Sequence, residues 1–532
     1  MRLDVRTWAL RGEGIPKSVF SVLASAMLLG GCTLGPNFSP PHPHVAARFH
    51  FPAANTVAPD RATSKTVNTA WWASFHDEML THLEDEAAAQ NLDVRIATER
   101  LAEARAQAEI AGAGLYPSLD FAGSFTREKP SKNGVFTAFG SQSNAATSTN
   151  AGATAGGGAA SVGGGGIAAP LIQPFNLLQY GFSSVFDFDL WGKNRRTEEA
   201  ALAAVEQSAE ARRAVLLNIE AEIAQDYIAL RADQTLLQIA EENLKSANRI
   251  AKLTTQREQA GLDNALDVAD SLAQAASIEA QIPSLRTAIS DQMSQIGLLL
   301  GRAPGALVAK LSAPARVPPV PPTVPIGLPS QLLTRRPDIR EALAKLHETT
   351  AEIGVAEASF FPDITLSGSV SLQALQLSDL NQLNAVTYAI GPEITLPLFS
   401  GGKLLGALHL RRAQQRAAAI DYAKVVLTAF HEVNDRLTAY DQEQFRLMAL
   451  KRDVRESRKA LMLAQERYQE GLSDYLEVLT AQQILLAAEQ AKAQSQAAIS
   501  TDLVRLYQAL GGGWEQSYPP AAASLATDKK PA

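Results

Sequence analysis

The only cysteine of this 532-residue chain, Cys32, is the side chain whose surroundings most clearly indicate a chemical reaction. It closes the motif Leu29-Gly30-Gly31-Cys32, which ends a short apolar run, 19–29, behind a basic N-terminal stretch. The run is too short for a permanent membrane span and is typical of a secretion signal. Small residues before a cysteine resemble a bacterial lipobox, in which the signal is cleaved and the cysteine is acylated. Residues 1–31 are therefore expected to be a lipoprotein signal peptide.

We expect Cys32 to carry the covalent lipid of such a modification, an N-palmitoyl chain and an S-linked diacylglycerol. The next residue is Thr33, and the absence of Asp at this position favours transport to the outer membrane. An ordinary buried thiol is the alternative, and the placement of the cysteine disfavours it. No later segment has about 20 consecutive apolar residues, so no transmembrane helix is expected after the signal.

Motifs for catalysis or for a resident cofactor are missing from the sequence. We find no nucleophile elbow, no phosphate-binding loop and no cysteine cluster. The glycine run 163–166 lies in low-complexity sequence, and His42, His44 and His50 are interpreted as incidental, so neither a catalytic nor a metal site is expected. The net charge of −7 gives no support to a nucleic-acid partner.

Two twelve-residue stretches of similar sequence, 257–268 and 467–478, reveal how the chain is organised. Each ends one long, polar, alanine-rich stretch and opens another. Gly261 and Gly471 occupy equivalent positions, where glycine permits the positive φ that lets a helix end and the chain reverse. The sequence therefore predicts two helical hairpins of matched design, and hence an internal duplication.

The first repeat is expected to span residues 71–300. It begins with helices and then has two stretches of alternating apolar and polar residues, about 117–126 and 179–190, that are typical of strands. The segment 141–166 between them is almost entirely small or polar and is predicted to be an exposed loop. A long hairpin, 194–300, closes the repeat. Its first arm would be roughly 100 Å long, and its second arm, from about 263 to 300, roughly 55 Å.

The second repeat, 331–511, restarts the same order of elements. Strands are expected at about 363–373 and 387–398, followed by a hairpin over 401–510. The remaining segments connect or flank the repeats: an acylated tether over 32–70, a proline-rich linker over 301–330 and a C-terminal tail over 512–532.

Four strands per chain set a condition on the assembly. Alternating aromatic and carboxylate residues fit a transmembrane β-barrel, although half-buried soluble strands share the pattern. Four strands cannot enclose an open lumen, and open strand edges do not occur in lipid. Copies of the chain must then share one barrel. Three copies would give twelve strands, but dimers and tetramers would also satisfy closure.

The chain as a whole resembles a known family, the TolC-like outer-membrane factors, and within it the lipoprotein (NodT-type) subgroup of outer-membrane efflux proteins. The residues that carry the resemblance are 29–38, Trp71-Trp72, 328–333, 335–341, 360–362, 398–402 and both Gly-Leu turns. The family implies a mainly α-helical fold with a β-barrel part. It also implies a homotrimer with a shared twelve-stranded outer-membrane barrel, a twelve-helix periplasmic tunnel and an equatorial belt.

The resemblance implies partners at the two glycine turns, which form the periplasmic tip of the tunnel. Gly261, Leu262, Gly471 and Leu472 are the positions expected to dock the hairpins of a membrane-fusion adaptor. That adaptor joins an inner-membrane pump of the RND or MFS type. Turn geometry and local packing already account for these residues, and both roles can hold together.

The same resemblance implies a gate made of hydrogen bonds between neighbouring hairpins. Tyr468 and Asp267 match the tyrosine and aspartate of one family latch. An arginine that makes a second latch is replaced by Ser473, and Arg467 is a candidate to compensate. Breaking such bonds would let the helix ends move apart like an iris.

The resemblance also implies one acidic residue at the periplasmic constriction of the tunnel. Glu477 matches the first of two acidic positions, whereas the second is Thr480. Three copies of Glu477 would form a ring that attracts cations, and mutual repulsion would raise their pKa values. The alternative is that Glu477 is a solvated helix residue.

These observations predict a passive exit duct of a tripartite efflux pump, lipid-anchored in the outer membrane and extending into the periplasm. It would conduct small toxic compounds and would not be an enzyme. A duct for type I protein secretion is one alternative, which lipid anchoring at Cys32 disfavours. A non-channel structural surface lipoprotein is another, which the paired strands disfavour.

Overall fold

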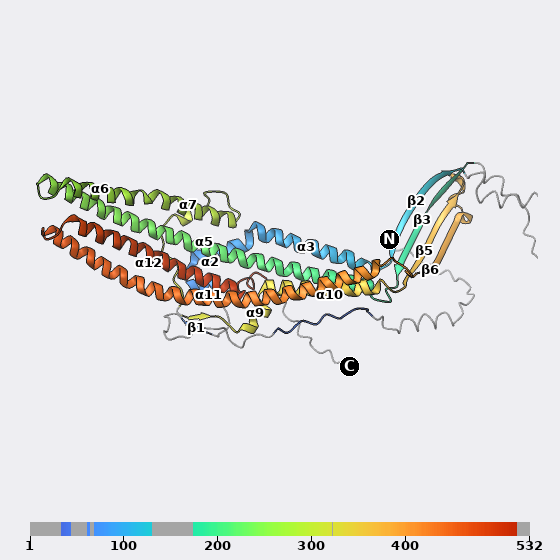
Figure 1. Cartoon of the computed structure of the whole chain (residues 1–532). Helices are drawn as coiled ribbons and strands as arrows, with labels where there is room; N and C mark the ends of the chain where they lie inside the picture. Colours follow the sequence, from blue (N-terminus) through green and yellow to red (C-terminus); the bar gives the residue numbers. More distant parts are fainter. Residues whose placement is uncertain (1–32, 44–60, 64–68, 130–173, 322, 519–532) are drawn as a thin grey trace, which may run out of the picture. The chain divides into compact units, whose positions relative to one another are not determined.

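A computed structural model describes residues 33–43, 61–63, 69–129, 174–321 and 323–518 (Figure 1). Cys32, the predicted signal peptide and the predicted loop 141–166 lie outside the described residues. The chain divides into two compact units. The sheet unit takes residues up to 36, 109–199 and 351–411, and the helical unit takes the rest. Each unit contains segments of both sequence repeats. In the sheet unit, strands of the two repeats pair with each other.

The sheet unit contains one antiparallel sheet of four strands in the order β2-β3-β5-β6. The strands are β2 (Ser118–Glu128), β3 (Phe175–Asp187), β5 (Asp363–Ala374) and β6 (Val386–Thr395). Pairing of β3 with β5 joins the two repeats. Among the described residues of one chain, β2 and β6 are edges with one neighbour each. The four predicted strands are therefore present, and the mainly α fold class with four strands per chain is confirmed.

Large apolar side chains stand exposed along the two edge strands. Phe121 and Phe125 on β2, and Tyr388, Ile390 and Ile394 on β6, are all more than half exposed in a single chain. They recur at alternate or near-alternate positions, so each strand presents one apolar face. An apolar band of this kind is what the lipid-facing side of a membrane barrel requires.

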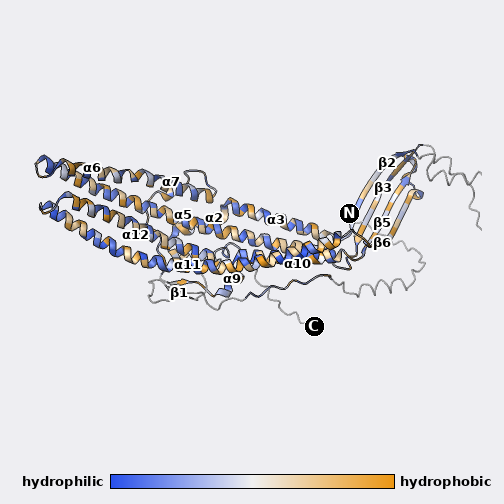
Figure 2. Cartoon of the chain, in the orientation of Figure 1, coloured by the Kyte–Doolittle hydropathy of each residue, from blue (hydrophilic) through white to orange (hydrophobic). Residues whose placement is uncertain are grey.

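The two long hairpins have first arms of identical length. Helix α5 (Lys193–Gln259) and helix α11 (Lys403–Gln469) each contain 67 residues. Each is followed by a glycine turn and a returning arm. In the first hairpin that arm consists of α6 (Ala265–Glu279) and α7 (Gln281–Leu299), and in the second it is the single helix α12 (Tyr475–Leu510). Figure 2 shows polar and apolar residues interleaved along all of them.

The interruption between α6 and α7 differs from the continuous arm expected over 263–300. Pro283 explains it, because its ring lacks an N–H and clashes with the carbonyl four residues earlier, that of Glu279, where α6 ends. The equivalent position in the second hairpin is Ala493, and α12 passes through it without a break. None of the described helices is both long enough and apolar enough to span a membrane.

The helical unit is held together by an apolar core that contains Trp71, Trp72 and Trp514. Trp71, in the short helix η1 (Trp71–Phe75), is fully buried and stacks on Tyr507 of α12 at 5.7 Å between ring centroids. Trp514 lies in the same core. Around them pack α2 (Glu78–Gln90), part of α3 (Leu92–Ala113), and residues of α5, α11 and α12. The core therefore binds the start of the first repeat to the end of the second.

The predicted linker and tether contain more structure than proline-rich connections need. Residues 301–330 include α8 (Val308–Leu311), β4 (Thr323–Pro325) and the start of α9 (Pro329–Arg335), which is followed by α10 (Pro337–Ala358). Strand β1 (Arg61–Thr63), inside the predicted tether, pairs in parallel with β4. The pairing of β1 with β4 thus joins one described part of the tether to the linker.

Candidate functional site: the turns of the two helical hairpins

The two hairpin turns have the same backbone geometry. Gly261 and Gly471 both have φ of +73°. The N–H of Leu262 donates to the carbonyl of Arg257 at 2.8 Å, and Leu472 donates in the same way to Arg467 at 2.8 Å. This is a Schellman motif, in which the glycine takes the left-handed conformation and satisfies the last helical carbonyls. A Cβ on either glycine would meet nothing within 4 Å, so conformation rather than space requires glycine there.

Leu262 and Leu472 project from these turns into solvent. Their exposed fractions are 67% and 66%. Two large aliphatic side chains held exposed at equivalent positions form a natural contact point for another protein. This is where the structure places the residues predicted to dock the adaptor. The docking itself stays a prediction.

A buried polar cluster connects the first turn to the second hairpin. The Tyr468 hydroxyl donates a short hydrogen bond to Asp263 Oδ2. The Nε of Arg257 donates to both carboxylate oxygens of Asp263, at 3.2 and 3.0 Å. The Arg257 guanidinium also lies 4.7 Å from the centroid of the Tyr468 ring. We call these three residues the tip cluster.

The tip cluster is shielded from water at its centre. Only 3% of Tyr468 is exposed, and burial, followed by the hydrogen bond to Asp263, raises its pKa to about 12. The hydrogen bond to Asp263 also raises the pKa of Arg257. Tyr468 is therefore a neutral donor, and Arg257 a cation, throughout the neutral range. Charge-assisted bonds of this kind are stronger than neutral ones.

The partner of Tyr468 within one chain is thus Asp263, one helical turn before the predicted Asp267. Asp263 belongs to the turn itself, whereas Asp267 lies in the first turn of α6, where its N–H is capped by Asn264 Oδ1 at 3.0 Å. Burial, followed by the charges of Tyr468, Asp270 and Asp267, raises the pKa of the neighbouring Tyr475 to about 12. The Tyr468–Asp267 pair stays a prediction for the assembled protein.

The second turn lacks an equivalent of the tip cluster. Ser473 occupies the position that Asp263 has in the first turn, and its hydroxyl is buried without a hydrogen-bond partner in the described chain. Arg467, the equivalent of Arg257, instead lies 3.9 Å from Glu477. Both side chains of that pair are about half exposed, so the pair contributes little to stability. The two turns share a backbone but differ in the charge that each one buries.

Glu477 stands beside a groove of about 750 Å³ between α11 and α12. Asp474 and Thr480 line the same groove, with small residues along its floor. The position suits a role in a constriction, because the carboxylate is half exposed and projects near the turn. The ring of three Glu477 residues stays a prediction, since it needs three copies of the chain.

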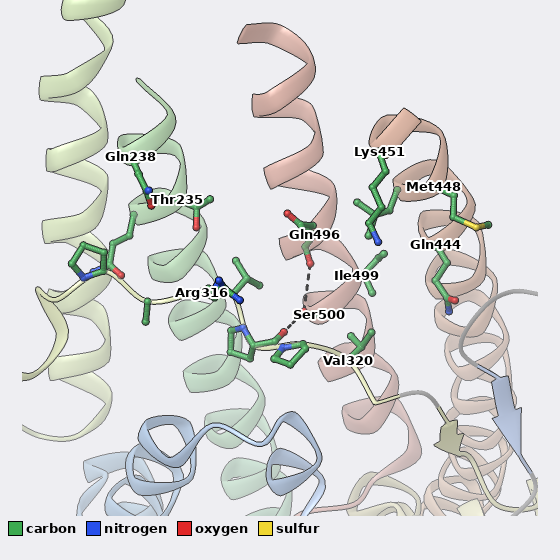
Figure 3. A pocket seen from close by; sticks show the side chains of 17 residues that line it. Thr235, Gln238, Arg316, Val320, Gln444, Met448, Lys451, Gln496, Ile499 and Ser500 are labelled. Carbon is green, nitrogen blue, oxygen red and sulfur yellow. Dashed lines mark hydrogen bonds between the residues drawn. The ribbon is translucent and has the colours of Figure 1, made fainter. Parts of the chain in front are cut away.

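A larger cavity, of about 790 Å³, lies between α5, α11, α12 and the proline-rich segment 314–320 (Figure 3). Ser500 on α12 donates to the carbonyl of Pro318 at 2.8 Å and holds the segment over the helices. Amide side chains and two cations, Arg316 and Lys451, line the cavity, but no carboxylate or histidine does. No metal-binding cluster occurs among the described residues.

Fold and site together define a class: a membrane channel subunit made of long helical hairpins and a four-stranded piece of barrel. The comparison with family models specifies it. The model of the outer membrane efflux protein family matches residues 83–156, 176–302 and 328–512. The chain belongs to this family.

Relatives and solved structures agree with that assignment. The chain is 30% identical over 522 residues to the probable efflux pump outer membrane protein TtgC of Pseudomonas putida, covering 96% of this chain and 99% of TtgC. It is 29% identical to nodulation protein T of Rhizobium leguminosarum bv. trifolii, covering 93% and 97%. The outer-membrane channel OprN superposes with a TM-score of 0.79 at 30% identity, over 91% of this chain and all of OprN. A CusC structure gives 0.75 at 26% identity, covering 91% of this chain and all of CusC.

The predicted TolC-like identity, including the NodT type, is therefore confirmed. The protein is an outer-membrane efflux channel, an exit duct that extends into the periplasm. Its relatives are channel proteins rather than enzymes.

The family resemblance assigns a latch role to Tyr468 but none to Asp263 or Arg257. A signal was present: the first turn has Arg257 and Asp263 six residues apart, whereas the second has Arg467 and Ser473. A charged pair that one copy of a duplication has and the other lacks indicates a role beyond the shared backbone.

Proposed function

We propose that three copies of this chain form the duct and that the tip cluster is its latch. The edges of β2 and β6 find no partner in the part of the chain that the structure describes, and three sheets joined edge to edge would close a barrel of twelve strands. Lipid on Cys32 anchors each copy in the outer membrane. The duct has no catalytic activity and passes small toxic compounds delivered by an inner-membrane pump of the RND or MFS type through a periplasmic adaptor.

The tip cluster supports the latch because it joins the two turns of a chain at one point. Asp263, in the turn of the first hairpin, accepts hydrogen bonds from Arg257 of the same hairpin and from Tyr468 of the second. Separating the hairpins breaks the Tyr468 bond and leaves a buried carboxylate with one partner fewer. A hydrogen bond to a charged group contributes about 1.5–3 kcal/mol. Three copies would therefore hold the closed state by several kcal/mol.

Adaptor binding supplies a physical route to opening. The exposed Leu262 and Leu472 lie directly beyond the two glycines. An adaptor can bury both leucines in separate contacts only if the distance between those contacts matches the distance between the two turns. Binding that favours the wider spacing shifts the population toward the open state.

Single-channel conductance in planar bilayers tests the latch. We expect Tyr468→Phe and Asp263→Asn each to raise conductance from the periplasmic side, because each weakens the bond while keeping the side-chain shape. Asp267→Asn is the comparison variant, because the family latch pairs Tyr468 with Asp267 whereas Tyr468 bonds to Asp263 within one chain. If Asp263 is the latch, Asp267→Asn should conduct like the unchanged protein. An open channel in Asp267→Asn together with a closed one in Asp263→Asn would assign the latch to the pair predicted from the family instead.

A further inference from the structure

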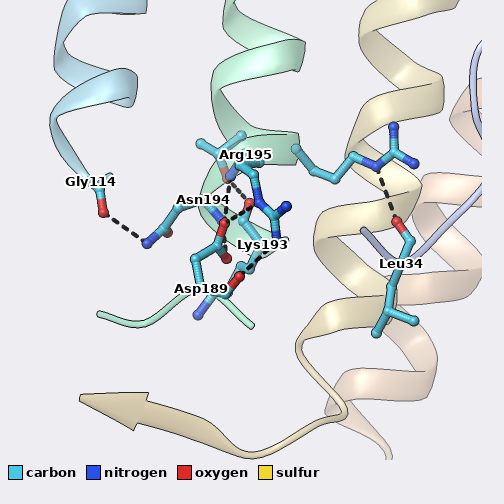
Figure 4. A network of polar contacts seen from close by, with 8 residues as sticks. Leu34, Gly114, Asp189, Lys193, Asn194 and Arg195 are labelled. Carbon is cyan, nitrogen blue, oxygen red and sulfur yellow. Dashed lines mark hydrogen bonds and ion pairs between the residues drawn. The ribbon is translucent and has the colours of Figure 1, made fainter. Parts of the chain in front are cut away.

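The residues that follow Cys32 are docked on the sheet unit. We call residues 33–36 the N-terminal strap. The N–H of Leu34 donates to the carbonyl of Trp191 at 3.0 Å, and Arg196 Nε donates to the carbonyl of Leu34 at 3.0 Å. Figure 4 shows the carbonyl of Leu34 accepting its hydrogen bond. Arg196 Nη2 reaches the carbonyl of Gly35 at 3.4 Å. Both backbone groups of Leu34 are thus satisfied by the body of the protein.

Two glycines of the body make room for the strap. A Cβ on Gly354 of α10 would lie 2.7 Å from the Leu34 carbonyl oxygen, and a Cβ on Gly192 would lie 2.8 Å from Thr33. On the other side of the contact, a Cβ on Gly35 would overlap the Cα of Gly354. Real Cβ atoms do not approach other heavy atoms so closely. We call Gly192, Arg196 and Gly354 the cradle.

The cradle is itself rigidly placed at the junction between strand and helix. Asp189, just after β3, accepts the N–H groups of Asn194 and Arg195 at 2.9 and 3.0 Å and so caps the start of α5 (Figure 4). The Trp191 indole donates to the carbonyl of Pro362 at 2.8 Å, and its ring lies 4.8 Å from that of Phe361. A capped helix start and a pinned indole leave the strap a fixed surface to bind.

We propose that the cradle is a docking site for the segment behind the lipid-modified cysteine, so that the acyl anchor has a fixed position beside the strand–helix junction. This proposal rests on the proposed lipid modification of Cys32. The peptide bond keeps the Cα of residue 32 within about 3.8 Å of that of Thr33. A free tether as long as the predicted one, 32–70, would instead let the anchor roam over roughly 35 Å.

A fixed anchor, unlike a free one, connects the lipid to both repeats of the chain. Arg196 and Gly192 belong to the start of the first hairpin, and Gly354 belongs to the second repeat. The strap therefore holds both repeats together next to the sheet, and the acyl chains bring that joint to the membrane surface. Strap docking sets the depth at which the sheet meets the lipid.

Two helical glycines offer a matched test. Gly354→Ala places a methyl group on the Leu34 carbonyl, whereas Gly406→Ala in α11 meets only open space. Hydrogen exchange of the strap, followed by mass spectrometry of the full-length protein in detergent, reports the Leu34 N–H. We expect exchange at least tenfold faster in Gly354→Ala and unchanged in Gly406→Ala. Arg196→Lys, which cannot serve both carbonyls, should give an intermediate acceleration without a steric clash.

Metabolic labelling with an alkynyl palmitate separates docking from modification. We expect equal label on the unchanged protein, Gly354→Ala and Gly406→Ala, and none on Cys32→Ser. The fraction of assembled protein in outer membranes should fall at least twofold in Gly354→Ala alone. An unlabelled wild-type protein would overturn the lipid modification. Rapid exchange of Leu34 in the wild type, or equal behaviour of the two alanine variants, would overturn the cradle.

Discussion

At the scale of single residues, the two hairpin turns differ in the polar groups that they bury. Asp263 is held by Arg257 and Tyr468, while its counterpart Ser473 has a buried hydroxyl that bonds to none of the described residues. One turn therefore forms a bond across the hairpins, and the other leaves Arg467 free to approach Glu477. The proposed latch therefore depends on the carboxylate of the first turn, whereas the predicted charged position, Glu477, follows the second turn.

The charge of Glu477 should affect which ions pass. We expect Glu477→Gln to lower the potassium-to-chloride permeability ratio by roughly twofold or more, because rings of carboxylates raise the local cation concentration. Reversal potentials across a potassium chloride gradient measure that ratio. Glu470→Gln, which removes the same charge from an exposed position near the turn, is the control, and an equal effect of both would contradict a ring.

Two buried carboxyl groups make stability depend on pH. Burial, followed by the charges of Glu220 and Asp85, raises the pKa of Glu84 well above 4.5, and burial followed by Glu515 does the same for Glu220. Glu84 is 1% exposed, and neither carboxylate oxygen has a hydrogen-bond partner in the described chain. A raised pKa means that the folded state holds its proton longer than the unfolded state. The free energy of unfolding therefore falls as pH rises from about 4.5 through the folded pKa.

Glu84→Gln should remove that dependence at one site. We expect the variant to lose less stability between pH 5 and pH 8 than the unchanged protein, with a slope smaller by at most about 1.4 kcal/mol per pH unit. Urea unfolding of the detergent-solubilised protein at several pH values measures the slope. Glu99→Gln, at an exposed position of α3, should leave it unaltered; identical slopes for both variants would show that Glu84 is not the titrating group.

At the scale of elements, the hairpins show how one substitution alters a duplicated design. The returning arm of the first hairpin is divided at Ala280, before Pro283, whereas α12 continues through the equivalent Ala493. Both arms follow identical turns and first arms of equal length. The proline therefore interrupts the returning helix, while the turn and the length of the first arm stay the same in both hairpins.

Exchanging the two residues tests that interpretation. Pro283→Ala should restore the missing N–H and fuse α6 with α7, which slows hydrogen exchange over residues 281–287. Ala493→Pro should break α12 at a buried position and destabilise the protein by about 3 kcal/mol or more. Thermal unfolding compares the two variants, and equal stability of both would mean that the arms do not depend on helix continuity.

At the scale of the whole molecule, a single chain is incomplete. In the described part of one chain the outer edges of β2 and β6 have no strand partner, and aromatic residues such as Phe121 and Tyr388 are exposed. Closure by copies of the same chain satisfies the edges, and lipid covers the aromatic band. The long hairpins then surround one continuous passage.

Native mass spectrometry of the protein released from detergent should show three chains. The same preparation should form pores in bilayers, because the barrel closes only in the oligomer. Phe121→Arg should lower the yield of the trimer, since an arginine on the lipid face costs up to about 2–4 kcal/mol. A stable monomer without pores would contradict the shared barrel.

The sequence by itself determined the elements of this protein, because their signals are local. Gly261 and Gly471 needed only a positive φ to indicate the turns, and alternation of side chains was enough to indicate the strands. Pro283 also carried a local signal, although a continuous arm was expected there. Only the tertiary structure decided which distant groups meet. Tyr468 bonds to Asp263, 205 positions away, because helix rotation at the turns sets which carboxylate faces it. The strap at Gly354 was equally hidden, since a glycine accommodating a carbonyl has the same sequence signature as any other helical glycine.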